Sequence, residues 1–224
     1  MVSATVLPSV PMSRHRAEKV WTIVVAAGSA TRFGRPKQFE SLGDQRVLDR
    51  SMSIARAASD GVVLVVPAAD TLIEGGVAGG ATRSESVRNG LAAVPSEATI
   101  ICVHDAARPF ADDAMYATVI DAVVAGADCA VPGVEVTDTV KIVDRDGRVV
   151  TTPDRATLRA VQTPQAFRAT ALRAAHASSA EGTDDAALVE ALGGTVVVVA
   201  GSADNRKITV PADLEWARAR VGVA

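Results

Sequence analysis

The stretch Trp-Thr-Ile-Val-Val-Ala-Ala-Gly-Ser-Ala-Thr-Arg-Phe-Gly-Arg-Pro-Lys, at residues 21–37, joins an apolar run to a turn of small residues. The run at 21–26 is rich in β-branched residues and predicts a strand that is covered on both faces. Small residues in the turn leave backbone N–H groups open to a ligand, and Arg32, Arg35 and Lys37 add positive charge. A strand followed by such a turn indicates a phosphate-binding site.

Two well-known nucleotide-binding patterns are missing from this stretch. It contains neither the GxGxxG fingerprint of dinucleotide-binding folds nor the GxxxxGK[ST] pattern of P-loop proteins. The sequence therefore disfavours a dinucleotide-dependent oxidoreductase and a P-loop NTPase. A Gly-Ser-Ala turn also occurs in ordinary loops, so the stretch by itself leaves that alternative open.

Along the rest of the chain, apolar β-branched runs alternate with amphipathic segments of helical period. This alternation predicts an α/β fold, Rossmann-like and doubly wound around a mostly parallel twisted sheet. Ligands are then expected beyond the carboxyl ends of the strands. The expected strands are residues 21–26, 62–66, 99–103, 129–132 and 195–199, and the expected helices are residues 47–59, 85–93, 112–125, 170–177, 185–192 and 211–220.

Residues 133–159 interrupt the alternation because they show no helical period. Two extended segments, 136–143 and 148–152, flank the turn Asp144-Arg145-Asp146-Gly147. An Asp-Gly pair in such a turn is typical of a β-hairpin. We expect an antiparallel β-arm that projects from the sheet. Since a hairpin has too little core to be stable alone, we expect this arm to pack against a second copy of the chain in a homodimer.

The composition fits a single α/β domain in a chain of 224 residues, of which 48% are hydrophobic. We expect this domain to occupy residues 20–224, after a flexible tail at 1–19. The formal net charge is -3, whereas a nucleic-acid-binding protein usually carries a basic excess. No apolar run reaches the roughly 20 residues of a membrane span. We therefore expect neither nucleic acid nor a membrane as a partner.

The two cysteines, Cys102 and Cys129, lie in apolar runs that are expected to be buried strands. No CxxC or Cys/His spacing accompanies them, so they do not indicate a metal site. Buried thiols without a disulfide framework are typical of a reducing compartment. We expect the protein to be cytoplasmic.

Eight short motifs in order give the sequence a specific resemblance. The first is the Ala-Ala-Gly loop that ends in Pro-Lys. The others are Gly79-Gly-Ala-Thr-Arg-Ser-Glu-Ser-Val87, Val103-His-Asp-Ala-Ala-Arg-Pro109, Asp138-Thr-Val-Lys141, Asp154-Arg155, Gln162-Thr-Pro-Gln165, Thr183-Asp-Asp185 and Asn205-Arg-Lys-Ile-Thr209. From about Val20 to its end, the chain resembles the 2-C-methyl-D-erythritol 4-phosphate cytidylyltransferase family of the sugar-phosphate nucleotidyltransferases.

The resemblance implies a reaction of the non-mevalonate isoprenoid pathway, in which a substrate phosphate oxygen attacks the α-phosphorus of CTP and pyrophosphate leaves. A phosphate monoester has a second pKa near ~6, so it is largely ionised at neutral pH and needs no general base. Catalysis then depends on positioning and on neutralisation of charge. We accordingly expect His104 to be packed or hydrogen-bonded rather than catalytic.

The resemblance also implies which residues hold CTP. Arg32, Lys37 and Lys207 are expected to be catalytic, through contacts with the phosphates. Asp105, at the end of a buried strand, is expected to hold Mg2+, with capping of the next helix as the structural alternative. The residues expected to bind the nucleotide are Ala26, Ala27, Gly28, Gly80, Arg83, Ser86 and Asp105.

A small polyol phosphate is the expected second substrate. In the homodimer, the arm of one chain is expected to reach the active site of its neighbour. Structural alternatives are a turn at Thr163, a helix N-cap at Thr183, and a surface pair of Arg155 with Asp154 or Asp146. The residues that the resemblance assigns to this acceptor are Arg108, Thr139, Arg155, Thr163 and Thr183.

Other functions remain as alternatives. A pentitol-phosphate cytidylyltransferase, such as the ribitol 5-phosphate enzyme, shares the fold and the nucleotide motifs, so only acceptor assays separate the two. A non-catalytic nucleotide-binding protein would also keep the loops. The joint presence of Lys37, Asp105, Arg155 and Lys207 argues against that last alternative.

Overall fold

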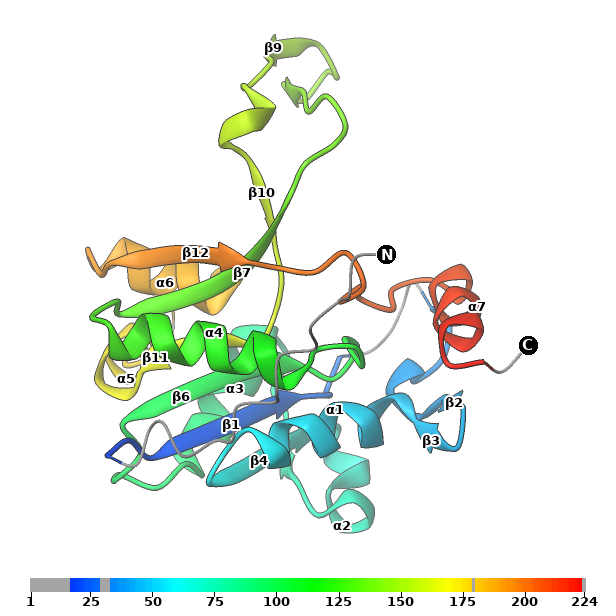
Figure 1. The fold of residues 1–224 in the computed structure, drawn as a ribbon, viewed down its shortest axis with the longest axis vertical. Coiled ribbons are helices and arrows are strands. Elements are labelled where there is room, and N and C mark those ends of the chain that lie inside the picture. The colour runs from blue at the N-terminus through cyan, green and yellow to red at the C-terminus, as the bar shows by residue number, and fades with distance from the viewer. Residues whose placement is uncertain (1–16, 29–32, 179, 223–224) are drawn as a thin grey trace, which may run out of the picture.

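The computed structural model of the protein describes residues 17–28, 33–178 and 180–222 (Figure 1). Most of the tail predicted at 1–19 therefore lies outside the described residues, and so does Arg32.

An eight-stranded sheet forms the centre of the molecule, in the order β10-β7-β11-β6-β1-β4-β5, with β12 also paired to β7. Its strands are β1 (Val20–Val25), β4 (Gly61–Val66), β5 (Val77–Ala78), β6 (Ile100–Asp105), β7 (Cys129–Glu135), β10 (Arg159–Val161), β11 (Gln165–Arg168) and β12 (Val196–Ala200). Only β10 and β11 run against the others. The predicted mostly parallel α/β sheet is thus confirmed.

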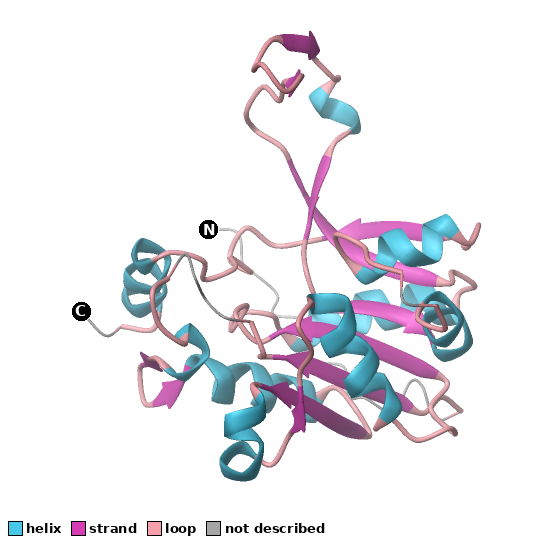
Figure 2. Ribbon diagram, turned by 180° about the vertical axis from the view of Figure 1, so that it is seen from behind, coloured by secondary structure: helices cyan, strands magenta, loops and turns pink. Residues whose placement is uncertain are grey.

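Helices cover both faces of this sheet, as a doubly wound fold requires. One apolar cluster joins the sheet to α1 (Val47–Ala57) and α4 (Asp113–Val124), which lie on the face seen in Figure 1. A second cluster joins the opposite face, turned toward the viewer in Figure 2, to α3 (Arg83–Ala92), α5 (Ala169–Ala175) and α6 (Asp185–Ala191). No helix in the described part of the chain is long and apolar enough to cross a membrane.

The six predicted helices all form, with ends within two residues of the prediction. Side-chain caps fix three of the starts: the side chains of Thr82, Asp112 and Asp184 each accept a hydrogen bond from a backbone N–H in the first turn. Such caps satisfy N–H groups that have no partner within the helix. The structural alternative for Thr183 was wrong by one residue, because Asp184 is the N-cap of α6.

A third apolar cluster brings the end of the chain back toward the first loop. Phe33 and Leu42 pack with Ile208 and Leu214, the last in α7 (Pro211–Arg220). Helix α7 contacts β2 (Ser41–Leu42), which forms a short hairpin with β3 (Gln45–Arg46), and the 3-10 turn η2 (Lys37–Phe39) contacts α1. This packing places Lys37 and the residues before α7 on the same side of the sheet.

The predicted arm projects from the body of the molecule (Figure 1). At its base β10 pairs with β7, and toward its tip β8 (Ile142–Val143) pairs with β9 (Val149–Thr151). Gly147, at the predicted turn, has a φ of +79°, which favours glycine. None of residues 134–161 is buried. The arm thus has no core within its own chain.

The remaining short elements connect this framework. They are η3 (Ala68–Asp70), α2 (Thr71–Glu74) and η4 (Arg155–Thr157).

Candidate active site

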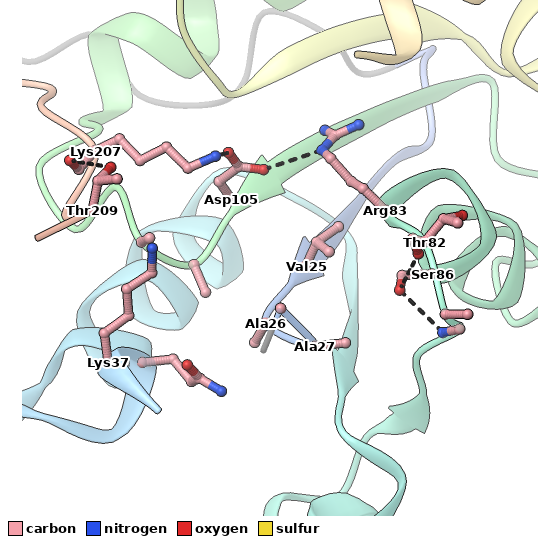
Figure 3. Close-up of a pocket in the computed structure, with 16 residues that line it drawn as sticks. Val25, Ala26, Ala27, Lys37, Thr82, Arg83, Ser86, Asp105, Lys207 and Thr209 are labelled. Carbon is pink, nitrogen blue, oxygen red and sulfur yellow. Dashed lines mark hydrogen bonds and ion pairs between the residues drawn. The ribbon is translucent and has the colours of Figure 1, made fainter. Parts of the chain in front are cut away.

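A cavity of about 410 Å³ opens at the carboxyl ends of β1 and β6 (Figure 3). The two strands are neighbours in register, with Val25 opposite Asp105, so the loops that follow them meet at one edge of the sheet. The cavity is lined by Val25, Ala26, Ala27, Gly28, Lys37, Gln38, Gly80, Ala81, Thr82, Arg83, Ser86, Asp105, Ala106, Ala107, Lys207 and Thr209.

Backbone forms the floor of the cavity, where the loop after β1 approaches the segment before α3. A Cβ atom added at Gly79 would lie 2.2 Å from Cβ of Ala27, so only glycine permits this approach. The hydroxyl of Ser86 accepts a hydrogen bond from Gly80 N (3.1 Å) and donates one to Thr82 O (2.9 Å). The side chain of Ser86 thereby fixes the loop against the first turn of α3.

Cationic side chains stand on opposite sides of this floor. Lys37 and Lys207 lie on one side, and Arg83 lies on the other (Figure 3). Lys207 Nζ is 2.6 Å from Asp105 Oδ2, and Arg83 Nε is 3.6 Å from Asp105 Oδ1. A cavity with positive charge on both sides and small residues on its floor suits a polyphosphate chain.

Asp105 is the acidic group at the centre of these cations. Burial raises the pKa of its carboxyl, but the charges of Lys207 and Arg83 lower that pKa by more than burial raises it. The net pKa lies well below the usual range. Its backbone N–H donates to Thr163 Oγ1 (3.0 Å), which fixes the end of β6. Asp105 is therefore ionised and held in place at neutral pH.

His104 is packed in the interior and hydrogen-bonded, as predicted. Its side chain is fully buried, and its Nδ1 lies 3.2 Å from Thr163 Oγ1. Burial lowers the pKa of His104 to about 4. Since it does not line the cavity, the ring has no direct access to a molecule bound there.

The described residues that we predicted to contact the nucleotide all line this cavity. Those predicted for the acceptor do not, and they fall into two groups. Arg108, Thr163 and Thr183 lie in the body of the protein. Arg108 donates to Asn205 O (2.7 Å), and the Thr163 hydroxyl is bonded to the backbone of Asp105. Thr183 is exposed, next to the cap of α6.

Thr139 and Arg155 form the second group, on the exposed arm. Arg155 Nη1 donates to Thr137 O (2.9 Å) and so ties the two sides of the arm together. The surface pair considered for Arg155 does not form, because Asp154 accepts from Ala156 N and Asp146 pairs with Arg148. The acceptor roles of both groups stay predictions.

Sequence reasoning missed several residues of the cavity. Thr82 could have been found, since it stands three residues before Glu85 in the pattern of a capping box. Thr209 ends the motif Asn205-Arg-Lys-Ile-Thr209, so that motif could have identified it. Gln38 directly follows Lys37, but it lies in no motif. Thr209 reaches the cavity because Ile208 N donates to Ala107 O (2.8 Å) and docks this segment beside β6.

Among the described residues that line the cavity, Asp105 is the one carboxylate that could hold a divalent cation. Among the described residues, no three His, Cys, Asp or Glu side chains gather as a metal cluster. Mg2+ commonly takes only one or two carboxylates and completes its shell with water and substrate phosphates. The ionised Asp105, beside space for a polyphosphate, fits this kind of site.

Comparison with known proteins agrees with the geometry. The family model described as IspD: 2-C-methyl-D-erythritol 4-phosphate cytidylyltransferase matches residues 20–222. A protein of that name from Frankia casuarinae is 44% identical over 214 residues, which cover 90% of this chain and 80% of the relative. Another from Rhodococcus jostii is also 44% identical, covering 90% of this chain and 95% of the relative.

Comparison of the fold with solved structures finds proteins with names of the same family. The crystal structure of 4-diphosphocytidyl-2C-methyl-D-erythritol synthase from Anaerococcus prevotii superposes with a TM-score of 0.80 at 30% identity, covering 92% of this chain and 99% of the other.

Proposed function

The chain belongs to the 2-C-methyl-D-erythritol 4-phosphate cytidylyltransferase family, and we propose that the cavity at the ends of β1 and β6 is where it transfers CMP. The reaction joins the CMP part of CTP to the phosphate of 2-C-methyl-D-erythritol 4-phosphate, in isoprenoid precursor synthesis. One observation carries the assignment of the site: Lys37 and Lys207 face Arg83 across a floor of small residues.

The chemistry of this transfer suits the residues present. An oxygen of the acceptor phosphate attacks the α-phosphorus of CTP, the bond from that phosphorus to the bridging oxygen breaks, and pyrophosphate leaves. The attacking phosphate is already ionised at neutral pH, which agrees with a cavity that His104 does not line. Lys37 and Lys207 neutralise the charge that builds on the phosphates, and Arg32 supplies a further cation.

We assign the rest of the nucleotide to the floor and its rim. Ala26, Ala27 and Gly28 line the cavity, and their small size lets phosphate approach, although the N–H of Ala26 itself donates to Val65 O (2.7 Å). Gly80 and Ser86 shape the side that holds the base. Arg83 orders that side through its contacts with α6. Asp105 would hold Mg2+, which would supply further positive charge to the phosphates.

The simplest test of this assignment is nucleotide selectivity. Pyrophosphate release is measured with Mg2+, 2-C-methyl-D-erythritol 4-phosphate and each of CTP, UTP, ATP and GTP. We expect rapid release with CTP and slow release with the other three nucleotides. Equal release with UTP would show that the rim at Gly80 and Ser86 does not read the base.

Replacing Asp105 by asparagine tests the Mg2+ site. The amide keeps the shape of the side chain but loses the charge that holds a hard cation, so the Mg2+ concentration for half-maximal activity should rise by about tenfold or more. CTP binding without Mg2+, measured by calorimetry, should change much less. An unchanged Mg2+ dependence would remove Asp105 from this role.

The arm supports a homodimer in the same proposal. Ile142, Val143, Val149 and Val150 expose between 50% and 65% of their surface near its tip, and an apolar hairpin without a core needs a partner surface. A second copy covers it, and Thr139 and Arg155 of one arm then complete the acceptor site of the neighbour. The two free, buried cysteines suit the cytoplasm, where we place the enzyme.

Sedimentation equilibrium tests the dimer. We expect a dimer at micromolar concentration, because the exposed apolar tip loses contact with water only in the assembly. Replacing Val149 and Val150 by aspartate should shift the mass to that of a monomer while far-UV circular dichroism stays unchanged. A monomer in the unaltered protein would contradict the dimer.

Arg155→Lys tests the acceptor role of the arm. Lysine keeps the charge but loses the planar fork that binds a phosphate through two hydrogen bonds. The KM for 2-C-methyl-D-erythritol 4-phosphate should rise by about tenfold, while CTP binding measured alone stays near normal. Arg148→Lys, on the same arm, is the matched control. Weaker CTP binding with an unchanged acceptor KM would refute the role of Arg155.

A further inference from the structure

We propose that His176 is a positioning residue for nucleotide binding, and that it acts through Asp185 to hold Arg83 at the wall of the cavity. The proposal rests on the nucleotide role assigned above to Arg83. It extends the active site to a buried pair of side chains that line no part of the cavity.

Three contacts in series lead from the interior to the cavity. His176 Nε2 lies 2.9 Å from Asp185 Oδ1, and Arg83 Nη1 lies 2.7 Å from Asp185 Oδ2. Arg83 then reaches toward Asp105 Oδ1, at 3.6 Å from Nε. Side-chain exposure is 1% at His176, 0% at Asp185 and 27% at Arg83. The series thus begins in the core and ends beside the proposed Mg2+ ligand.

Asp185 is the anchor of this series. Among the described residues, each of its two carboxylate oxygens has one side-chain partner, so His176 at the C-cap of α5 and Arg83 on α3 together fix its position. A fully buried carboxylate is strongly destabilising unless it is paired, which keeps both contacts in place. Burial lowers the pKa of Arg83, but the charges of Asp185 and Asp105 raise it above its ordinary value.

The two contacts of Arg83 differ in length, so Asp185 fixes the guanidinium more firmly than Asp105 does. Its contact with Asp185 is a hydrogen bond, whereas its contact with Asp105 is 3.6 Å long. When Asp105 engages a cation, Arg83 therefore keeps its place. Nδ1 of His176 is buried and has no partner in the part of the chain that the structure describes, which fits a ring that carries its hydrogen on Nε2 and donates it to Asp185.

The segment before α6 is held against α3 by other hydrogen bonds, so it does not need this series of contacts. Glu181 already accepts hydrogen bonds from Thr82 Oγ1 (3.0 Å) and Arg88 Nη2 (3.1 Å), and Gly182 N donates to Ser84 Oγ (3.4 Å). These contacts join the segment before α6 to the first turns of α3. What the buried pair adds is control over the direction of the Arg83 guanidinium.

The experiment compares kcat/KM for CTP in four variants of the full-length enzyme. His176→Leu keeps most of the volume but removes the donor, and it should lower kcat/KM for CTP by about tenfold. His176→Gln, whose amide can replace Nε2, should stay close to the unaltered enzyme. Arg173→Gln is the matched control, since it removes hydrogen bonds from α5 to Val94 O and Pro95 O, near the other end of α3. His176→Asn, whose amide lies nearer to Nδ1, should behave like His176→Leu.

A double-mutant cycle identifies the route of the effect. In an Arg83→Gln background, His176→Leu should cause little further loss of kcat/KM for CTP. Additive losses, or a loss in His176→Leu no larger than in Arg173→Gln, would overturn the proposal. If His176→Leu does not fold, the His176→Gln and His176→Asn pair decides the matter, since equal kinetics in those two would overturn it as well. An Arg83→Gln enzyme with normal CTP kinetics would instead refute the nucleotide role of Arg83.

Discussion

Lys37→Ala should lower kcat by about a hundredfold to a thousandfold while the protein stays folded. The expected size follows from the cost of removing one fixed group that stabilises charge in a transition state. Lys37 lines the cavity at the start of η2, on the same side as Lys207. Steady-state pyrophosphate release at saturating CTP and acceptor measures the change.

Lys19→Ala is the matched control for Lys37→Ala. Lys19 is exposed just before β1 and does not line the cavity, so its loss should leave kcat unchanged. Near-normal turnover in Lys37→Ala would show that this side chain does not contact the reacting phosphates.

Lys207→Ala should have a comparable effect on kcat, of about a hundredfold or more. It should also lower the free energy of unfolding by about 1–2 kcal/mol, because the carboxylate of Asp105 loses a partner at 2.6 Å. Pyrophosphate release and urea denaturation measure the two effects separately.

The double variant Lys207→Ala with Asp105→Asn separates catalysis from stability. Removing the charge at Asp105 removes the unpaired carboxylate, so the free energy of unfolding should recover. The activity should not recover, since the cation that neutralises phosphate charge is still missing. Recovery of both would mean that Lys207 acts only by pairing with Asp105.

The layered fold was predictable from the sequence because long elements carry a strong periodic signal. Helix α7 begins and ends at the predicted residues, and helix α4 differs by one residue at each end. The strand β11 was missed: it has only four residues, directly follows Pro164, and is antiparallel between β6 and β7. This segment is a strand because it pairs with β6 and β7, and a local sequence pattern contains no information about such pairing.

The candidate site was predictable where a motif and a strand end coincide. Asp105 lies in the cavity for this reason, and Lys37 lies there because it ends the motif that follows β1. The hydroxyl of Thr163 accepts a hydrogen bond from the backbone N–H of Asp105, a contact between distant parts of the sequence that its motif does not reveal. The link from His176 to Arg83 joins residues that are 93 positions apart in the sequence. Only the folded chain brings them together, so no local motif reveals it.

The comparison of acceptors tests the central claim most directly. With CTP and Mg2+ held constant, pyrophosphate release is measured as kcat/KM for 2-C-methyl-D-erythritol 4-phosphate and for ribitol 5-phosphate. The family assignment predicts that the first acceptor is preferred by about a hundredfold or more, because a pocket built for one pattern of hydroxyl groups strongly rejects another. An equal or higher kcat/KM for ribitol 5-phosphate would contradict the assignment of the acceptor.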